Sequence, residues 1–238
     1  MDTFMQYYDL NSVSNFDVLK NIFKSLSGDN IKYILDYAYI KKYQKNELIL
    51  NKENCSEALY ILLNGIIHIG YLSVSGRFHA FNYFSEKNLI NALPCLKGHI
   101  IDYDYYAFNQ VRVLVIPKHI FLEELKNNNG LKQDVFDLIA LRMHHLIAEI
   151  KFLHVANLHQ KICKTLLNLA LQYGLHHPLG IEIYLKISQH DLADLLSTSR
   201  QTINKEIKNL VGLNIIEWQY ENIVIKDLQY LKYKVNDI

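Results

Sequence analysis

The chain has 238 residues, half of them hydrophobic, and its formal net charge is +1. This apolar content can form a sizeable core and excludes an intrinsically disordered protein, whereas the near-neutral charge argues neither for nor against a nucleic-acid partner. We find no secretory signal peptide and no run of about 18 apolar residues, so we expect a cytoplasmic protein without a membrane span.

The three cysteines, Cys55, Cys95 and Cys163, lie far apart and form no CxxC pair. Zinc and iron–sulfur sites need closer cysteine spacings, so we expect reduced thiols and no metal. The sequence also contains no paired-carboxylate motif, no Gly-rich phosphate loop and no GxSxG nucleophile motif. We therefore expect that the protein is not an enzyme.

Residues 1–28 are interpreted as an N-terminal arm with short helical pieces that ends at Ser27-Gly28-Asp29. A short helix is predicted over residues 29–38, followed from Tyr39 to about Val115 by short runs of Tyr, Ile, Val and Phe that alternate with turn residues. Turns roughly every 8 to 12 residues are typical of a compact antiparallel β domain. We predict a sensor-like domain over residues 29–130.

Two dipeptides are the strongest predicted hairpin turns of this domain, Asn64-Gly65 and Ser75-Gly76. A helical pattern follows Pro117 and is interrupted at residues 127–130.

A long helix is predicted over residues 131–158, with apolar residues spaced by three and four positions. This spacing favours a coiled-coil seam between two copies of the chain, and the alternative is a helix that packs on its own β domain. The predicted seam residues are Val135, Leu138, Ile139, Leu146, Ile150 and Leu153.

The remaining residues, 159–238, are predicted to form a second domain with a helix over 160–173 and a strand over 181–187. Ser188 and Asp191 are spaced as a capping box for a helix over 189–196. After a break at Ser197-Thr198-Ser199, a second helix begins near Ser199, and residues 215–225 follow as a β-hairpin. Two helices with such a short connection and a following hairpin indicate a winged helix-turn-helix. Ser197 stands at the turn position where Gly is common.

In a helix-turn-helix, the second helix enters the DNA major groove with its N-terminal end. Arg200, Gln201 and Lys205 are predicted to face outward and read bases, because Arg and Lys bind guanine and Gln binds adenine. The predicted phosphate contacts are Ser188, His190, Ser199 and Thr202. The alternative is an ordinary capped helix that faces water, and residues 186–212 hold only four basic residues against three acidic ones.

Three stretches resemble the Crp/Fnr superfamily of bacterial transcription regulators: ALYILLNGIIHI, KTLLNLA at 164–170, and ISQHDLADLLSTSRQTINKEIKNL at 187–210. In that family the recognition helix opens with Ser-Arg-Glu/Gln-Thr, followed by a basic residue one turn later. The resemblance implies an α+β fold with an N-terminal antiparallel, jelly-roll-like β-roll, a long dimerisation helix and a C-terminal winged helix-turn-helix. It also implies a homodimer that binds a palindromic promoter site in double-stranded DNA and contacts RNA polymerase.

The segment that corresponds to the family's cyclic-nucleotide cassette departs from the pattern. Ala92 stands at the Glu position, and the Arg position is Ile101 or Asp102, where an acid would repel phosphate. The adenine-reading pair corresponds to the apolar Leu146 and Ile147. The resemblance therefore implies that neither cyclic AMP nor cyclic GMP is the ligand.

Three interpretations of the β domain stay open. It could hold a small apolar or aromatic effector, or its side chains could fill the space. The candidate pocket residues are Ala92, Leu93, Tyr103, Tyr105, Leu146 and Ile147. A haem or metal sensor that uses the chain's several histidines is a third possibility that no residue spacing requires.

Overall fold

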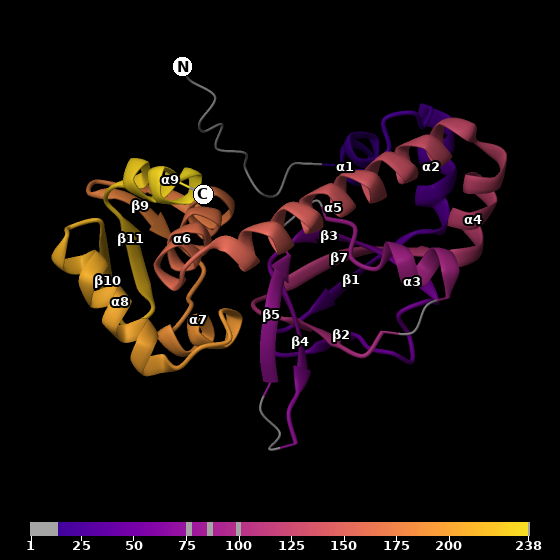
Figure 1. Cartoon of the computed structure of the whole chain (residues 1–238). Helices are drawn as coiled ribbons and strands as arrows, with labels where there is room; N and C mark the ends of the chain where they lie inside the picture. Colours follow the sequence, from indigo (N-terminus) through magenta and orange to yellow (C-terminus); the bar gives the residue numbers. More distant parts are fainter. Residues whose placement is uncertain (1–13, 75–77, 85–87, 99–100, 238) are drawn as a thin grey trace. The chain divides into compact units, whose positions relative to one another are not determined.

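The computed structural model describes residues 14–74, 78–84, 88–98 and 101–237 (Figure 1). Contacts between residues divide the chain into two compact units. The first unit comprises Met1–Leu72 and Asn82–Leu141, and the second comprises Ser73–Phe81 and Arg142–Ile238. Every helix in the described ranges is too short or too polar to cross a membrane.

The first unit has a helical layer packed on one face of a β-sheet. Its helices are α1 (Asn15–Ile22), α2 (Gly28–Tyr37), α3 (Ala92–Lys97), α4 (Lys118–Asn127) and the first part of α5 (Asn129–Val155). The interruption predicted at residues 127–130 is the boundary between α4 and α5.

The described part of the predicted N-terminal arm contributes to the core of the first unit. Leu19 and Phe23 are fully buried, in one apolar cluster with the helices α2, α4 and α5. Ser27 caps α2 by accepting a hydrogen bond from the Asn30 backbone N–H, so Gly28 opens a helix where the sequence analysis expected a segment to end. The remainder of the arm lies outside the described residues.

The described strands before α4 form two antiparallel sheets with the orders β1-β7-β3 and β2-β6-β4-β5; they belong to the first unit, except that β5 is divided between the two units at Phe81. Their bounds are β1 (Tyr39–Tyr43), β2 (Leu48–Leu50), β3 (Ala58–Asn64), β4 (Ile67–Leu72), β5 (Phe78–Phe84), β6 (Asp104–Ala107) and β7 (Val111–Pro117). Successive side chains of β3 enter two cores: Leu59 and Ile61 face the helices, whereas Tyr60 and Leu62 pack with residues of the second sheet. Burial on both faces explains why β3 is a nearly continuous apolar run.

The turn at Asn64-Gly65 has a different role from the one predicted. A turn does form there, but β3 and β4 belong to different sheets, so it carries the chain from one sheet to the other instead of closing a hairpin. Gly65 has a φ of +94°, and a Cβ at this position would lie 2.3 Å from the carbonyl oxygen of Gln110. Both the backbone conformation and the close approach require glycine. The Ser75-Gly76 turn lies outside the described residues.

The second unit contains α6 (Leu158–Tyr173), α7 (Gln189–Leu195), α8 (Arg200–Gly212), α9 (Leu228–Asn236) and a sheet of order β10-β11-β9-β8. The strands are β8 (Gly174–His177), β9 (Gly180–Ile183), β10 (Ile216–Gln219) and β11 (Asn222–Ile225). Residues 174–183, of which only 181–183 were predicted as a strand, form the antiparallel pair β8–β9.

Two predicted boundaries in this unit need correction. The long helix ends at Val155 instead of Leu158, because Asn157 and Gln160 form a capping box that starts α6. The predicted strand 181–187 ends at Ile183. Leu185 and Ile187 are buried apolar residues, so they continue the alternating pattern without belonging to the strand.

Candidate nucleic-acid interface

The predicted helix-turn-helix is present in α7 and α8. Ser188 and Asp191 form the predicted capping box, and Ser199 caps α8 by accepting from the Thr202 backbone N–H. Ile203, Ile207 and Leu210 are buried on one face of α8, and Leu192 is buried on α7. The sequence thus provides both helix starts and the apolar faces that hold the two helices together.

The turn between these helices has a left-handed residue. Ser197 has a φ of +50°, a conformation in which side chains other than Gly are strained. Its backbone N–H donates to Asp194 O and the next N–H, of Thr198, donates to Ala193 O, which closes α7. Ser197, at the turn position where Gly is common, therefore carries backbone strain.

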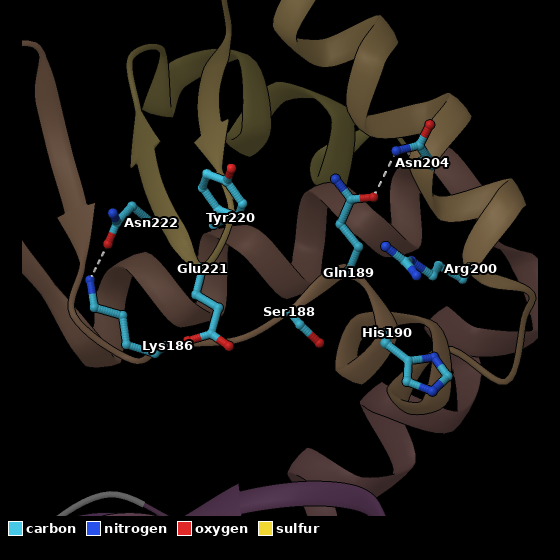
Figure 2. A pocket seen from close by; sticks show the side chains of 9 residues that line it. All are labelled: Lys186, Ser188, Gln189, His190, Arg200, Asn204, Tyr220, Glu221 and Asn222. Atoms are coloured by element: carbon cyan, nitrogen blue, oxygen red, sulfur yellow. Dashed lines mark hydrogen bonds between the residues drawn. The ribbon is translucent and has the colours of Figure 1, made fainter.

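The N-terminal part of α8 presents polar side chains to solvent. Arg200, Gln201 and Lys205 are exposed, as predicted for residues that read bases. Arg200 also lines a groove of about 770 Å³, whereas Gln201 and Lys205 are not among the groove's lining residues (Figure 2). The groove lies between the helix-turn-helix and the turn joining β10 to β11, and its lining residues are Lys186, Ser188, Gln189, His190, Arg200, Asn204, Tyr220, Glu221 and Asn222.

The four predicted phosphate contacts differ in their surroundings. Ser188 donates both its N–H and its O–H to the Asp191 carboxylate, at 2.9 and 2.7 Å. The Ser199 and Thr202 hydroxyls lie 2.8 Å apart and hydrogen-bond each other. His190 is exposed and lines the groove. The two serines therefore serve first as helix caps, and Ser188 and His190 are the predicted phosphate contacts that line the groove.

Several residues of the groove have no recognisable signal as site residues in the sequence. Asn204 donates from Nδ2 to Oε1 of Gln189 over 2.9 Å, which joins α8 to α7. The hairpin β10–β11 is the wing. Lys186 hydrogen-bonds Asn222 of this wing, and Tyr220 at its turn is almost fully exposed. Asn204 follows Arg200 by four residues, and residues at this spacing share a helix face, so its position could have been inferred.

The six residues predicted to line an effector pocket do not share one cluster. Ala92 packs with the helical layer, whereas Tyr105 packs between the two sheets and has the Tyr103 ring 5.6 Å from its own. Leu93 is exposed. Leu146 and Ile147 belong to the second unit and are exposed as well.

The segment compared with the cyclic-nucleotide cassette contains a polar side chain that is fully buried. Asn91 accepts a hydrogen bond from Tyr60 N over 2.9 Å and donates to the carbonyl oxygens of Cys55 and Ala58, each over 2.7 Å. The amide of Asn91 thus fixes the loop before β3 to α3. Sequence reasoning missed this role, because the partners are backbone atoms more than thirty residues away.

Within the described ranges, no three His, Cys, Asp or Glu side chains gather in a way that could hold a metal ion. All three thiols are buried. Burial raises the pKa of Cys95 and of Cys163 to about 11, against an ordinary value of 9.0. These two thiols are therefore protonated at neutral pH and are poor nucleophiles.

Two family models match the chain: a cyclic nucleotide-binding domain over residues 40–128 and a Crp-like helix-turn-helix domain over residues 160–233. The cAMP-activated global transcriptional regulator CRP of Salmonella typhimurium is 22% identical over 204 residues, which cover 85% of this chain and 96% of that protein. The anaerobic regulatory protein of Bacillus subtilis is 21% identical over 215 residues, which cover 88% of this chain and 89% of that protein.

Solved structures show the same fold. A CRP/FNR-family transcriptional regulator from Thermus thermophilus superposes with a TM-score of 0.70 at 18% identity, and the match covers 83% of this chain and 98% of that one. The two matched domains follow each other as β-roll and winged helix-turn-helix, with α5 between them. The chain belongs to the Crp/Fnr family, whose members are DNA-binding transcription regulators and not enzymes.

Proposed function

We propose that the protein binds a palindromic promoter site as a homodimer, contacts RNA polymerase there and responds to no cyclic nucleotide. The observation that carries the DNA-binding part is the groove beside α8, where the exposed Arg200 lies next to donors from α7 and the wing. The groove has polar side chains from α7, α8 and the wing, which could contact the sugar-phosphate backbone of one DNA strand. The exposed N-terminal end of α8 would then face the base edges.

The homodimer is supported by an apolar stripe on α5. Leu146, Ile150 and Leu153 are 44–55% exposed and follow one another at spacings of four and three residues, as in a coiled coil. Val135, in contrast, is buried in the core of the first unit, and Leu138 and Ile139 pack against that core. We therefore place the contact between protomers on the second half of α5, and the first half of the predicted seam within one chain.

The independence from cyclic nucleotide is supported by the side chains of the cassette segment. Ala92 supplies a methyl group where a carboxylate would hold ribose, and Asp102 brings a negative charge to the phosphate region. The Asn91 amide uses its hydrogen bonds within the fold. The relative in Salmonella is described as cAMP-activated, so this protein would differ from it in its ligand.

The test is selection of binding sites from random duplex DNA at a fixed salt concentration, without ligand and with cyclic AMP or cyclic GMP. Recovery of one palindrome with the same affinity in all arms is the expected result. A palindrome that appears or binds more tightly only with a nucleotide would contradict the ligand proposal. Recovery of a single half-site would contradict the homodimer.

A further inference from the structure

The groove beside the helix-turn-helix contains a pair of amide side chains that joins α7 to α8. Asn204 lies four residues after Arg200 on α8, and Gln189 is the first residue of α7. All three side chains line the groove (Figure 2). Because residues four apart share one face of a helix, Asn204 continues the row that Arg200 begins.

The hydrogen bond from Asn204 Nδ2 to Gln189 Oε1, 2.9 Å long, fixes how both amides are oriented. An amide carries two N–H donors and one carbonyl acceptor. This single bond therefore leaves Asn204 with its acceptor and one N–H, and leaves Gln189 with two N–H donors. Both residues are half-buried, so their remaining donors and acceptors are held near one place at the groove wall.

We infer that Asn204, positioned by Gln189, is a further specificity-determining residue that reads an A·T base pair. Adenine presents the N7 acceptor and the N6 donor side by side in the major groove, and an amide acceptor next to an amide N–H complements them. Since Gln189 already holds Asn204 in one orientation, binding would lose less side-chain entropy than with an unpaired Asn. The inference rests on the proposed DNA binding and adds a residue to it.

The base pair read by Asn204 would differ from the one read by Arg200. Four residues along a helix correspond to about 6 Å, and successive bases lie roughly 3.4 Å apart along the DNA axis. The two residues would therefore read base pairs one or two steps apart. Gln201, the adenine reader expected from the sequence, is exposed but is not among the lining residues of this groove.

The experiment compares base preferences of the wild type and the variants Asn204→Ala, Gln189→Ala, the double variant, Arg200→Ala and Gln201→Ala. Each is used in selection from random duplexes and then titrated with single-base variants of the selected site. We expect Asn204→Ala to lose roughly tenfold of the preference at one A·T pair of each half-site and to keep the preference that Arg200→Ala removes elsewhere. Gln189→Ala should weaken the same A·T preference, and the double variant should lose no more than Asn204→Ala.

Asn209→Ala, the same substitution at an exposed position of α8, is the matched control and should retain affinity and preference. Far-UV circular dichroism checks that every variant is folded. The inference is overturned if Asn204→Ala keeps all base preferences, if it weakens binding equally on every sequence, or if Gln201→Ala removes the A·T preference instead. A wild type that selects no sequence would overturn the proposed function as well, which is a separate and recognisable result.

Discussion

At the residue scale, the stability of the first unit depends on a polar side chain in its interior. The amide of Asn91 satisfies one backbone N–H and two backbone carbonyl groups that are removed from water. Buried backbone groups that lose a partner destabilise a protein by about 1–3 kcal/mol each. Asn91 therefore contributes more to the free energy of unfolding than its position at the start of a six-residue helix would indicate.

We predict that Asn91→Ala lowers the free energy of unfolding of the first unit by about 2–4 kcal/mol, because the Tyr60 N–H is then buried without a partner. The measurement is urea unfolding followed by circular dichroism. Lys97→Ala, an exposed change on the same helix, serves as the control and should stay within about 0.5 kcal/mol of the wild type. Equal stability of the two variants would show that water replaces the amide.

The raised thiol pKa values lead to a prediction about alkaline pH. Between pH 9 and 11 the Cys95 and Cys163 thiols stay protonated in the folded chain, whereas they ionise when the chain unfolds. The folded state then binds more protons than the unfolded state, so the free energy of unfolding falls as the pH rises through this range. Urea unfolding at pH 8 and pH 10 measures this, and Cys163→Ala should reduce the difference. A stability that rises with pH would contradict the prediction.

At the scale of elements, a three-residue hydrogen-bond chain ties the recognition helix to its neighbours. His159 of α6 lies with Nδ1 2.9 Å from the Glu206 carboxylate of α8 and with Nε2 3.2 Å from the Tyr230 hydroxyl of α9. A carboxylate only accepts hydrogen bonds, so Nδ1 donates to Glu206, and Nε2 lies within hydrogen-bonding distance of the Tyr230 hydroxyl. Apolar packing and this polar contact together fix α8.

We predict that the double-mutant cycle of His159→Ala and Glu206→Ala gives a coupling energy of about 0.5–1 kcal/mol, since both side chains are partly exposed. Tyr230→Phe should lower the free energy of unfolding by about 0.5–1 kcal/mol because one hydrogen bond is lost. Thermal unfolding provides both values. Tyr233→Phe on the exposed face of α9 is the control and should have no effect. Strict additivity of the cycle would show that the contact contributes nothing.

The elements that could be predicted from the sequence are those whose signals are local. Ser188 and Asp191 are three residues apart, so the capping box can be recognised in the sequence. The apolar residues of α8 recur every three or four positions, so the helix can be recognised as well. The partners of β3 and of Asn91 lie far along the chain, and no local pattern identifies them. The four-residue spacing from Arg200 places Asn204 on the same helix face, but its hydrogen bond to Gln189 could not be predicted because Gln189 belongs to another helix.

At the scale of the whole molecule, the exposed stripe on α5 predicts the oligomeric state. We expect Ile150→Asp to convert the proposed homodimer to a monomer, because the carboxylate would be buried in the proposed seam. Light scattering should show a change from about twice the chain mass of 27.9 kDa to the chain mass itself. Affinity for a palindrome should fall by at least about 100-fold as the two half-sites are no longer bound together.

Lys151→Asp, at the neighbouring exposed position, changes the charge more and should leave the dimer intact. If Ile150→Asp remains dimeric, the contact between protomers lies elsewhere on the chain.

The turn at Gly65, which sends the chain from one sheet to the other, also determines when the first unit can fold. The strand β3 does not pair with β4, which follows it. Both β1 and β3 pair with β7, where Tyr39 pairs with Val115 and Ala58 with Pro117. During synthesis on a ribosome, these apolar strands cannot pair until β7 has emerged. Long-range pairing of this kind is slow, and the unpaired strands can aggregate in the meantime. The wing, in which Gln219 pairs with Asn222, can close as soon as it is synthesised.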